Sequence, residues 1–147
     1  MKKLLLALLI CLFLTSQAFA AEVLRTAIMN TTFNAVTTVA NSTATDIQGC
    51  DKTAFFVVYD ETEVGNSISA AITLDISYDN ATYQDASFYD YTGSSTLQTS
   101  ETISADSSYY CWFNKDLVVP YVRVNVAATN TDADDLLNVK IYLVTKN

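Results

Sequence analysis

A regular alternation of apolar and polar residues between positions 68 and 78 limits the fold of this chain more than any other feature. Successive side chains of a β-strand leave on opposite sides, so a period of two indicates one buried face and one solvated face. At about 3.3 Å per residue the strand would be roughly 35 Å long. The even positions are all apolar, namely Ile68, Ala70, Ile72, Leu74, Ile76 and Tyr78. The pattern predicts a long strand of an antiparallel sheet.

Two hairpins are predicted around this strand. Residues 53–59 form a β-branched and aromatic run that is typical of a central strand covered on both faces. Gly65-Asn66 follows this run and suits a hairpin turn, which would make residues 53–59 and 68–78 antiparallel neighbours. The alternating segments 121–128 and 137–143 predict a second hairpin. Weaker strand patterns lie at residues 23–29, 33–39, 83–91, 99–105 and 109–113.

These patterns predict an all-β fold. No helical period longer than one turn is visible after residue 20. About seven to nine strands with closely spaced turn signals indicate an antiparallel β-sandwich, either jelly-roll or Ig-like. We expect an extended N-terminal segment at residues 21–48 and a sandwich domain at residues 49–147, together forming one structural unit.

The first 20 residues have the order of a secretory signal peptide. A basic start with Lys2 and Lys3 precedes an apolar run at residues 4–14 and the small-residue pattern Ala18-Phe19-Ala20. The run is shorter than the roughly 20 residues that a membrane-spanning helix needs. We expect cleavage after Ala20 and a secreted, extracellular protein without a membrane anchor.

The charge balance argues against nucleic acid as a partner. The sequence has eight basic and sixteen acidic residues, and removing Lys2 and Lys3 leaves six basic ones and a net charge of −10. Such a chain repels phosphate backbones and anionic lipids. We expect no nucleic-acid partner.

Enzyme chemistry has little support in the sequence. There is no histidine, which is the commonest general base and a common transition-metal ligand. No serine lies in a nucleophile-elbow context. Sixteen acidic residues could place two carboxylates across a groove, but a solvated acidic surface explains them as well. We expect a protein that is not an enzyme and has no cofactor, with calcium as the one ligand to test.

The loop at residues 130–135 carries that calcium hypothesis. Asp132, Asp134 and Asp135 supply oxygen ligands at close spacing, but the glycine and the glutamate of an EF-hand loop are replaced by Asp135 and Ile141. The loop is therefore either a hairpin-loop calcium site or a solvated acidic turn.

Cys50 and Cys111 are the two cysteines that remain after Ala20. In an oxidising compartment such a pair favours one disulfide. A bridge closing about 60 residues would contribute about 4 kcal/mol in the chain-entropy account. The alternative is a pair of buried free thiols.

Local patterns add a resemblance to known proteins. Residues 77–83 (Ser-Tyr-Asp-Asn-Ala-Thr-Tyr) and residues 120–126 (Pro-Tyr-Val-Arg-Val-Asn-Val) resemble strand-turn-strand signatures of small β-sandwich modules in phage virion and secreted surface proteins. The Thr/Asn/Ala/Val-rich segment that follows the signal peptide is similar to that of secreted filament subunits which lend an N-terminal strand to a neighbour. This resemblance implies a structural or binding role.

The N-terminal segment therefore has two interpretations. Its apolar points could pair with the open edge of the next copy by strand exchange, or residues 22–40 could form the first strands of their own sandwich. The candidate interaction residues are Val23, Leu24, Ile28, Phe33 and Val36. The sequence favours a secreted, self-associating filament or surface-layer subunit that forms a homo-oligomer or polymer. The alternative is a carbohydrate-binding or adhesive module whose exposed tyrosines and Trp112 stack on a glycan.

Overall fold

The computed structural model describes residues 23–50, 52–62, 67–90, 97–104, 107–113 and 119–146, and for residues 90 and 107–113 it describes the backbone only. Within these ranges the regular structure consists of strands alone. No helix in the described ranges is long and apolar enough to cross a membrane. The predicted signal peptide lies outside the described residues.

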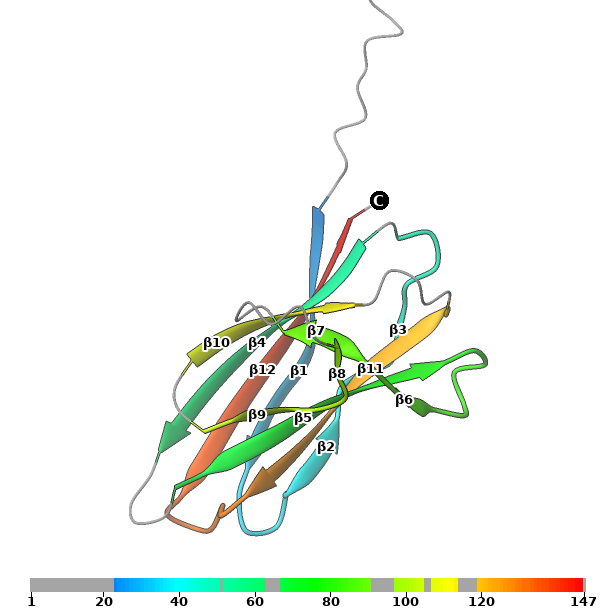
Figure 1. Cartoon of the computed structure of the whole chain (residues 1–147). Helices are drawn as coiled ribbons and strands as arrows, with labels where there is room; N and C mark the ends of the chain where they lie inside the picture. The colour runs from blue at the N-terminus through cyan, green and yellow to red at the C-terminus, as the bar shows by residue number, and fades with distance from the viewer. Residues whose placement is uncertain are drawn as a thin grey trace, which may run out of the picture.

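The strands form two six-stranded sheets that face each other (Figure 1). Sheet A has the order β1 (Val23–Phe33), β12 (Leu136–Lys146), β4 (Lys52–Thr62), β10 (Ser107–Phe113), β7 (Phe88–Asp90) and β8 (Leu97–Gln98). Sheet B has the order β2 (Val39–Asn41), β11 (Tyr121–Thr129), β5 (Ser69–Ser77) and β6 (Gln84–Ala86), with β3 (Thr45–Asp46) beside β11 and β9 (Glu101–Ile103) beside β5. All neighbours are antiparallel. The predicted all-β antiparallel sandwich is confirmed.

The core lies between the two sheets and is built from alternating positions of the long strands. The largest fully buried side chains are Tyr59, Phe33, Phe88, Ile68, Ile103, Leu137, Ile141, Val57, Val122, Val124, Val126 and Val139. The alternation predicted for residues 68–78 holds from Ile68 to Leu74, whose even positions are buried. Beyond Leu74 the pattern reverses, because Asp75 and Ser77 are buried and Ile76 is half-buried. Tyr78 follows the end of β5 at Ser77 and is 83% exposed.

Both predicted hairpins are wrong in their pairing. β4 pairs with β12 and β10, whereas β5 pairs with β11, β6 and β9 in the other sheet. Likewise β11 and β12 lie in different sheets. An alternating pattern shows that a strand has one buried face, but it does not identify the strand beside it. Here the connections cross from one sheet to the other instead of closing hairpins.

The segment at residues 83–91 is also not one strand. β6 ends at Ala86 in sheet B, and β7 begins at Phe88 in sheet A. The chain therefore changes sheets at Ser87. Such short strands raise the number to twelve in the described residues, above the predicted seven to nine. Six of the twelve have seven or more residues, and these form most of both sheets.

The N-terminal segment forms the first strands of its own sandwich, and strand exchange is not the arrangement in the structure. Residues 23–33 are β1, which pairs along its length with β12, and β2 pairs with β11. Phe33 is completely buried in the core of the same chain. The irregular apolar pattern that suggested exchange comes from a bulge between Ala27 and Met29, which shifts the register and buries both Ile28 and Met29.

Candidate functional site

The outer face of sheet A carries an apolar strip with no protein layer over it in the described structure. The odd positions of β4 point into the core, so its even positions point outward together with the even positions of β12 opposite them. Large side chains on this face are only partly exposed, and we call Phe56, Val58, Tyr142 and Val144 the apolar strip. Residues 53–59, predicted to be covered on both faces, are buried on the inner face, whereas on the outer face Ala54 is buried and Phe56 and Val58 are partly exposed.

Arg25 lies on the apolar strip. Its guanidinium carbon is 3.9 Å from the ring centre of Tyr142 and 5.5 Å from that of Phe56. The two rings are 6.3 Å apart. Stacking of a cation on aromatic rings contributes about 0.5–1 kcal/mol at an exposed site. It also holds the charge of Arg25 over the apolar strip, because Arg25 of the edge strand β1 lies opposite Val144 of β12.

Positive charge gathers around the strip. Lys52 and Lys146 are direct partners in the register of β4 and β12, Lys140 lies opposite Val58, and all three are exposed. Asp60 is the one acidic residue at the outward positions of these strands. We call the apolar strip with Arg25, Lys52, Lys140 and Lys146 the basic face. None of these four cations forms an ion pair within the described part of the chain.

The outer face of sheet B has the opposite character. Asp75 of β5 is 7% exposed and accepts a hydrogen bond from Nε of Arg123 at 2.8 Å. The guanidinium carbon of Arg123 also lies 3.8 Å from the ring centre of Tyr83. Two further carboxylates share this face, since Asp85 pairs with Asp75 and Asp46 pairs with Tyr121. We call Asp46, Asp75, Asp85 and Arg123 the acidic face.

The acidic loop does not gather its carboxylates around a common point. Oδ1 of Asp132 accepts hydrogen bonds from the backbone N–H groups of Asp134 and Asp135, both at 2.8 Å. These bonds lower the pKa of Asp132, with the Asp135 N–H contributing most. Asp135 is buried, whereas Asp132 and Asp134 are exposed. The described residues contain no group of three or more carboxylate, thiol or imidazole side chains that could hold a metal ion.

A second aspartate closes the loop after β5. Oδ1 of Asp79 accepts hydrogen bonds from the N–H groups of Thr82 (2.8 Å) and Ala81 (2.9 Å) and from Oγ of Ser77 (3.0 Å). Together these bonds, led by that of Thr82, lower the pKa of Asp79 from 3.8 to about 2. Asn80 takes a left-handed backbone conformation in the same loop (φ 59°).

The loop closed by Asp79 should stabilise the fold less in acid. A carboxylate with a lowered folded-state pKa stabilises the fold above its unfolded pKa, and the contribution is lost as the pH falls through the folded value. For Asp79 the window lies between 3.8 and about 2. The Asp79→Asn variant keeps an acceptor oxygen but does not titrate. When the pH is lowered across this window, the thermal unfolding midpoint of the variant should therefore fall less than that of the unchanged protein. Equal decreases would contradict this role of Asp79.

The five predicted interaction residues divide into two groups. Ile28 and Phe33 are buried in the core, whereas Val23, Leu24 and Val36 are 63%, 56% and 90% exposed. The free edge of β1 is also partly closed, because the N–H of Thr43 donates to the carbonyl oxygen of Ile28 at the bulge. A bulge and a covering segment are common protections of an edge strand. The segment is therefore chiefly structural.

The predicted disulfide stays a prediction. Cys50 is partly buried, and the side chain of Cys111 lies outside the described residues. The backbone register places Cys111 opposite Phe55, five residues after Cys50. Five residues span at most about 16 Å when fully extended, whereas bridged Cα atoms lie within about 7 Å. A bridge would therefore require that the chain between Cys50 and Phe55 is not fully extended.

The predicted glycan platform is only partly described. The side chains of Tyr109, Tyr110 and Trp112 lie outside the described residues, although the backbone of Trp112 pairs with Ala54. Tyr78 is exposed, and Tyr83 is half-buried beneath Arg123. The described tyrosines on sheet B are thus partly occupied by contacts within the chain.

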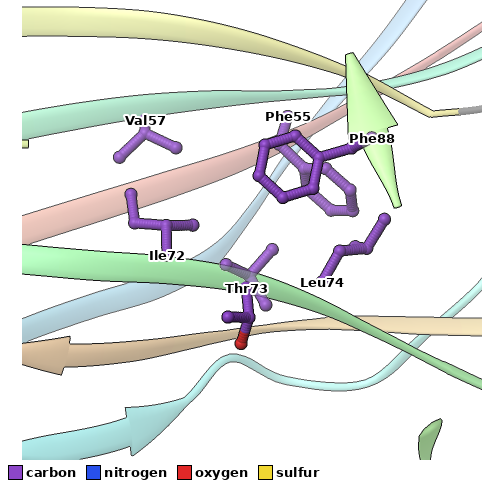
Figure 2. A pocket seen from close by; sticks show the side chains of 7 residues that line it. Phe55, Val57, Ile72, Thr73, Leu74 and Phe88 are labelled. Atoms are coloured by element: carbon purple, nitrogen blue, oxygen red, sulfur yellow. The ribbon is translucent and has the colours of Figure 1, made fainter. Parts of the chain in front are cut away.

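A small cavity between the sheets is apolar and offers no site for chemistry. Figure 2 shows Phe55, Val57, Ile72, Leu74 and Phe88 around it, while the Thr73 hydroxyl points away from the aromatic rings. A pocket for a polar ligand needs polar groups that converge on it. We assign this cavity to imperfect core packing.

The two charged faces were not predicted from the sequence. The available signal was the alternation of the last strand, which puts Lys140 and Tyr142 on the same face. The contact of Arg25 with Tyr142 depends on the register between strands far apart in sequence, and the pairing of Asp85 with Asp75 depends on the length of the turn between β5 and β6.

Comparison with known proteins identifies the fold. No family model matches the chain, and no curated protein matches it in sequence. The structure is similar to the crystal structure of the SPBc2 prophage-derived protein YomS, with a TM-score of 0.56 and 11% sequence identity. The match covers 86% of this chain and 95% of that chain. At this identity the similarity concerns the fold alone, and it agrees with the resemblance to phage-type sandwich modules.

Proposed function

We propose that the protein is a secreted, non-enzymatic structural subunit that self-associates outside the cell into filaments or a surface layer. The apolar strip on sheet A is the observation that carries this proposal. Phe56, Val58, Tyr142 and Val144 lie side by side on an outward face and are partly exposed. Among the described residues Arg25 stacks on Tyr142 and Phe56, and no described strand lies over the strip. Contiguous apolar surface of this kind marks interaction sites in proteins that are otherwise polar outside.

The sheet edges favour contact through a face over contact through strand addition. At one edge of sheet A, β1 is bulged and partly covered near Ile28, and at the other edge β8 has two residues. The outer strands of sheet B, which are β2, β3, β6 and β9, have two or three residues each. Short or bulged edges resist pairing with another chain. The outer faces remain as the larger contact surfaces.

Self-association can be measured on the purified protein. Sedimentation velocity at low ionic strength should show a weight-average sedimentation coefficient that rises with protein concentration, and electron microscopy should show polymers. Replacing Tyr142 with serine should lower the association constant at least about tenfold, because a central aromatic side chain often contributes 2 kcal/mol or more to an interface. Val36→Ser is the matched control, since Val36 is 90% exposed and lies off this face. A single monomeric species at every concentration would overturn the proposal.

Glycan binding is the second candidate function. The observation in its favour is Tyr78, a large aromatic side chain that is 83% exposed at the end of β5. Aromatic rings at the surface of secreted sandwiches can stack on sugar rings. Retention of a monomeric protein on a polysaccharide column, lost in Tyr78→Ala, would favour this function over self-association.

A further inference from the structure

We propose that copies of this chain stack head to tail, with the basic face of one copy against the acidic face of the next. The stacking rests on the proposed self-association, and it identifies the surface that covers the apolar strip. The partner is a second copy of the same chain, because the chain presents both complementary surfaces itself.

The distribution of charge is the first argument. From residue 21 onward the chain has six basic residues, the eight of the full sequence without Lys2 and Lys3. Four of these six lie on the basic face, although the chain is strongly acidic. On the acidic face Arg123 is neutralised by Asp75, which leaves Asp46 and Asp85 without an ion pair within the described part. Copies with a large negative net charge repel one another unless a local positive surface meets a negative one.

Charge also selects this pairing over symmetric ones. Two basic faces would bring Arg25, Lys140 and Lys146 against the same residues of another copy. Two acidic faces would bring Asp46 and Asp85 of one copy against the same residues of another. Juxtaposition of like charges at an interface costs several kcal/mol, whereas complementary potentials favour encounter and fix orientation.

The two faces are similar in size. The three neighbouring strands β1, β12 and β4 of sheet A have eleven residues each, so they cover roughly 36 Å by 14 Å, about 500 Å². The two nine-residue strands of sheet B with the short strands beside them cover about 450 Å². A standard protein interface buries about 800 Å² per partner. The contact is therefore somewhat smaller than standard and should be reversible and sensitive to salt.

The positions of the two faces determine which kind of assembly forms. They lie on opposite sides of the sandwich, because each is the outer surface of a different sheet (Figure 1). A contact between two different surfaces leaves one of each kind free at the ends. Such a heterologous contact extends as an open chain of subunits unless the rotation closes a ring.

Two variants test the stacking. The basic-face variant is Lys140→Glu with Lys146→Glu, and the acidic-face variant is Asp46→Asn with Asp85→Lys, all at exposed positions. Asp134→Lys, in an exposed loop away from both faces, is the control for the acidic-face variant, since it reverses one charge without altering either face. Circular dichroism establishes that each variant is folded. Each face variant alone should associate at least about tenfold more weakly than the unchanged protein, while the control should associate normally.

Mixing the variants gives the decisive result. The basic-face variant keeps an unchanged acidic face, and the acidic-face variant keeps an unchanged basic face. These two surfaces should bind each other and form one-to-one dimers that grow no further. Association of the unchanged protein should also weaken at about 1 M salt, where the screening length falls to about 3 Å. Normal association of the acidic-face variant would overturn head-to-tail stacking while leaving self-association intact. A monomeric unchanged protein would overturn the proposed function as well.

Discussion

Replacing Phe33 with alanine should destabilise the fold by about 3–5 kcal/mol, because the change removes a large aromatic side chain from a fully packed site. Phe33 is 0% exposed at the end of β1, where it pairs with Leu137 of β12. Denaturant unfolding of the purified protein measures this loss. Val36→Ala is the control, since Val36 is 90% exposed and its truncation should change the stability by no more than about 0.5 kcal/mol.

The same experiment distinguishes folding within one chain from strand exchange. Both proteins carry Tyr142→Ser and are unfolded at about 1 M salt, because these conditions weaken association through the outer faces. If β1 belongs to its own sandwich, the unfolding midpoints with and without Phe33→Ala should then not depend on protein concentration. A midpoint that still rises with concentration, or a loss below about 1 kcal/mol, would contradict the packing of β1 against β12 in the same molecule.

Replacing Arg123 with methionine should cost about 2–3 kcal/mol. The substitution leaves the nearly buried carboxylate of Asp75 without the donor that lies 2.8 Å away, and removes the stack on Tyr83. Loss of one partner of a fully buried ion pair costs about 3–5 kcal/mol, and we expect less because the Arg123 side chain is 27% exposed.

Arg25→Met is the matched control for this experiment. Arg25 also stacks on a tyrosine, but it makes no ion pair among the described residues. Its replacement should cost no more than about 1 kcal/mol. In the Arg123→Met background, Asp75→Asn should recover part of the loss, because it removes the uncompensated charge. Equal losses for the two arginine variants would contradict a structural role for the Asp75–Arg123 pair.

The fold class could be predicted from local pattern, but the arrangement of strands could not. Alternation identified the buried positions of residues 68–74 and of β11 and β12, because the period of side chains is a property of one strand. Pairing depends on partners far along the chain, so the expected neighbour of β4 proved to lie in the other sheet. The bulge near Ile28 interrupts the alternation of β1, so a strand was predicted at residues 23–29, short of its end at Phe33.

The candidate faces show the same limit. Lys140 and Tyr142 could be placed on one face from sequence alone, but the register is needed to bring Arg25 and Lys52 beside them. The acidic loop shows the converse. Its composition allowed a calcium site or a solvated acidic turn, and in the structure the Asp132 carboxylate accepts hydrogen bonds from the backbone of the turn. Composition identifies the available ligands, and local hydrogen bonding decides how they are used.

Zero-length cross-linking of the unchanged protein, followed by peptide mass spectrometry, tests the head-to-tail stacking most directly. A carbodiimide joins a lysine amine to a carboxylate only where they are in contact. Within one copy, Lys140 and Asp85 lie on opposite outer faces, separated by two sheets and a core about 10 Å thick. We predict linked peptides that join Lys140 or Lys146 to Asp85 or Asp46, with a yield that falls on dilution. Cross-linked oligomers in which these lysines are joined only to carboxylates outside the acidic face would contradict the stacking.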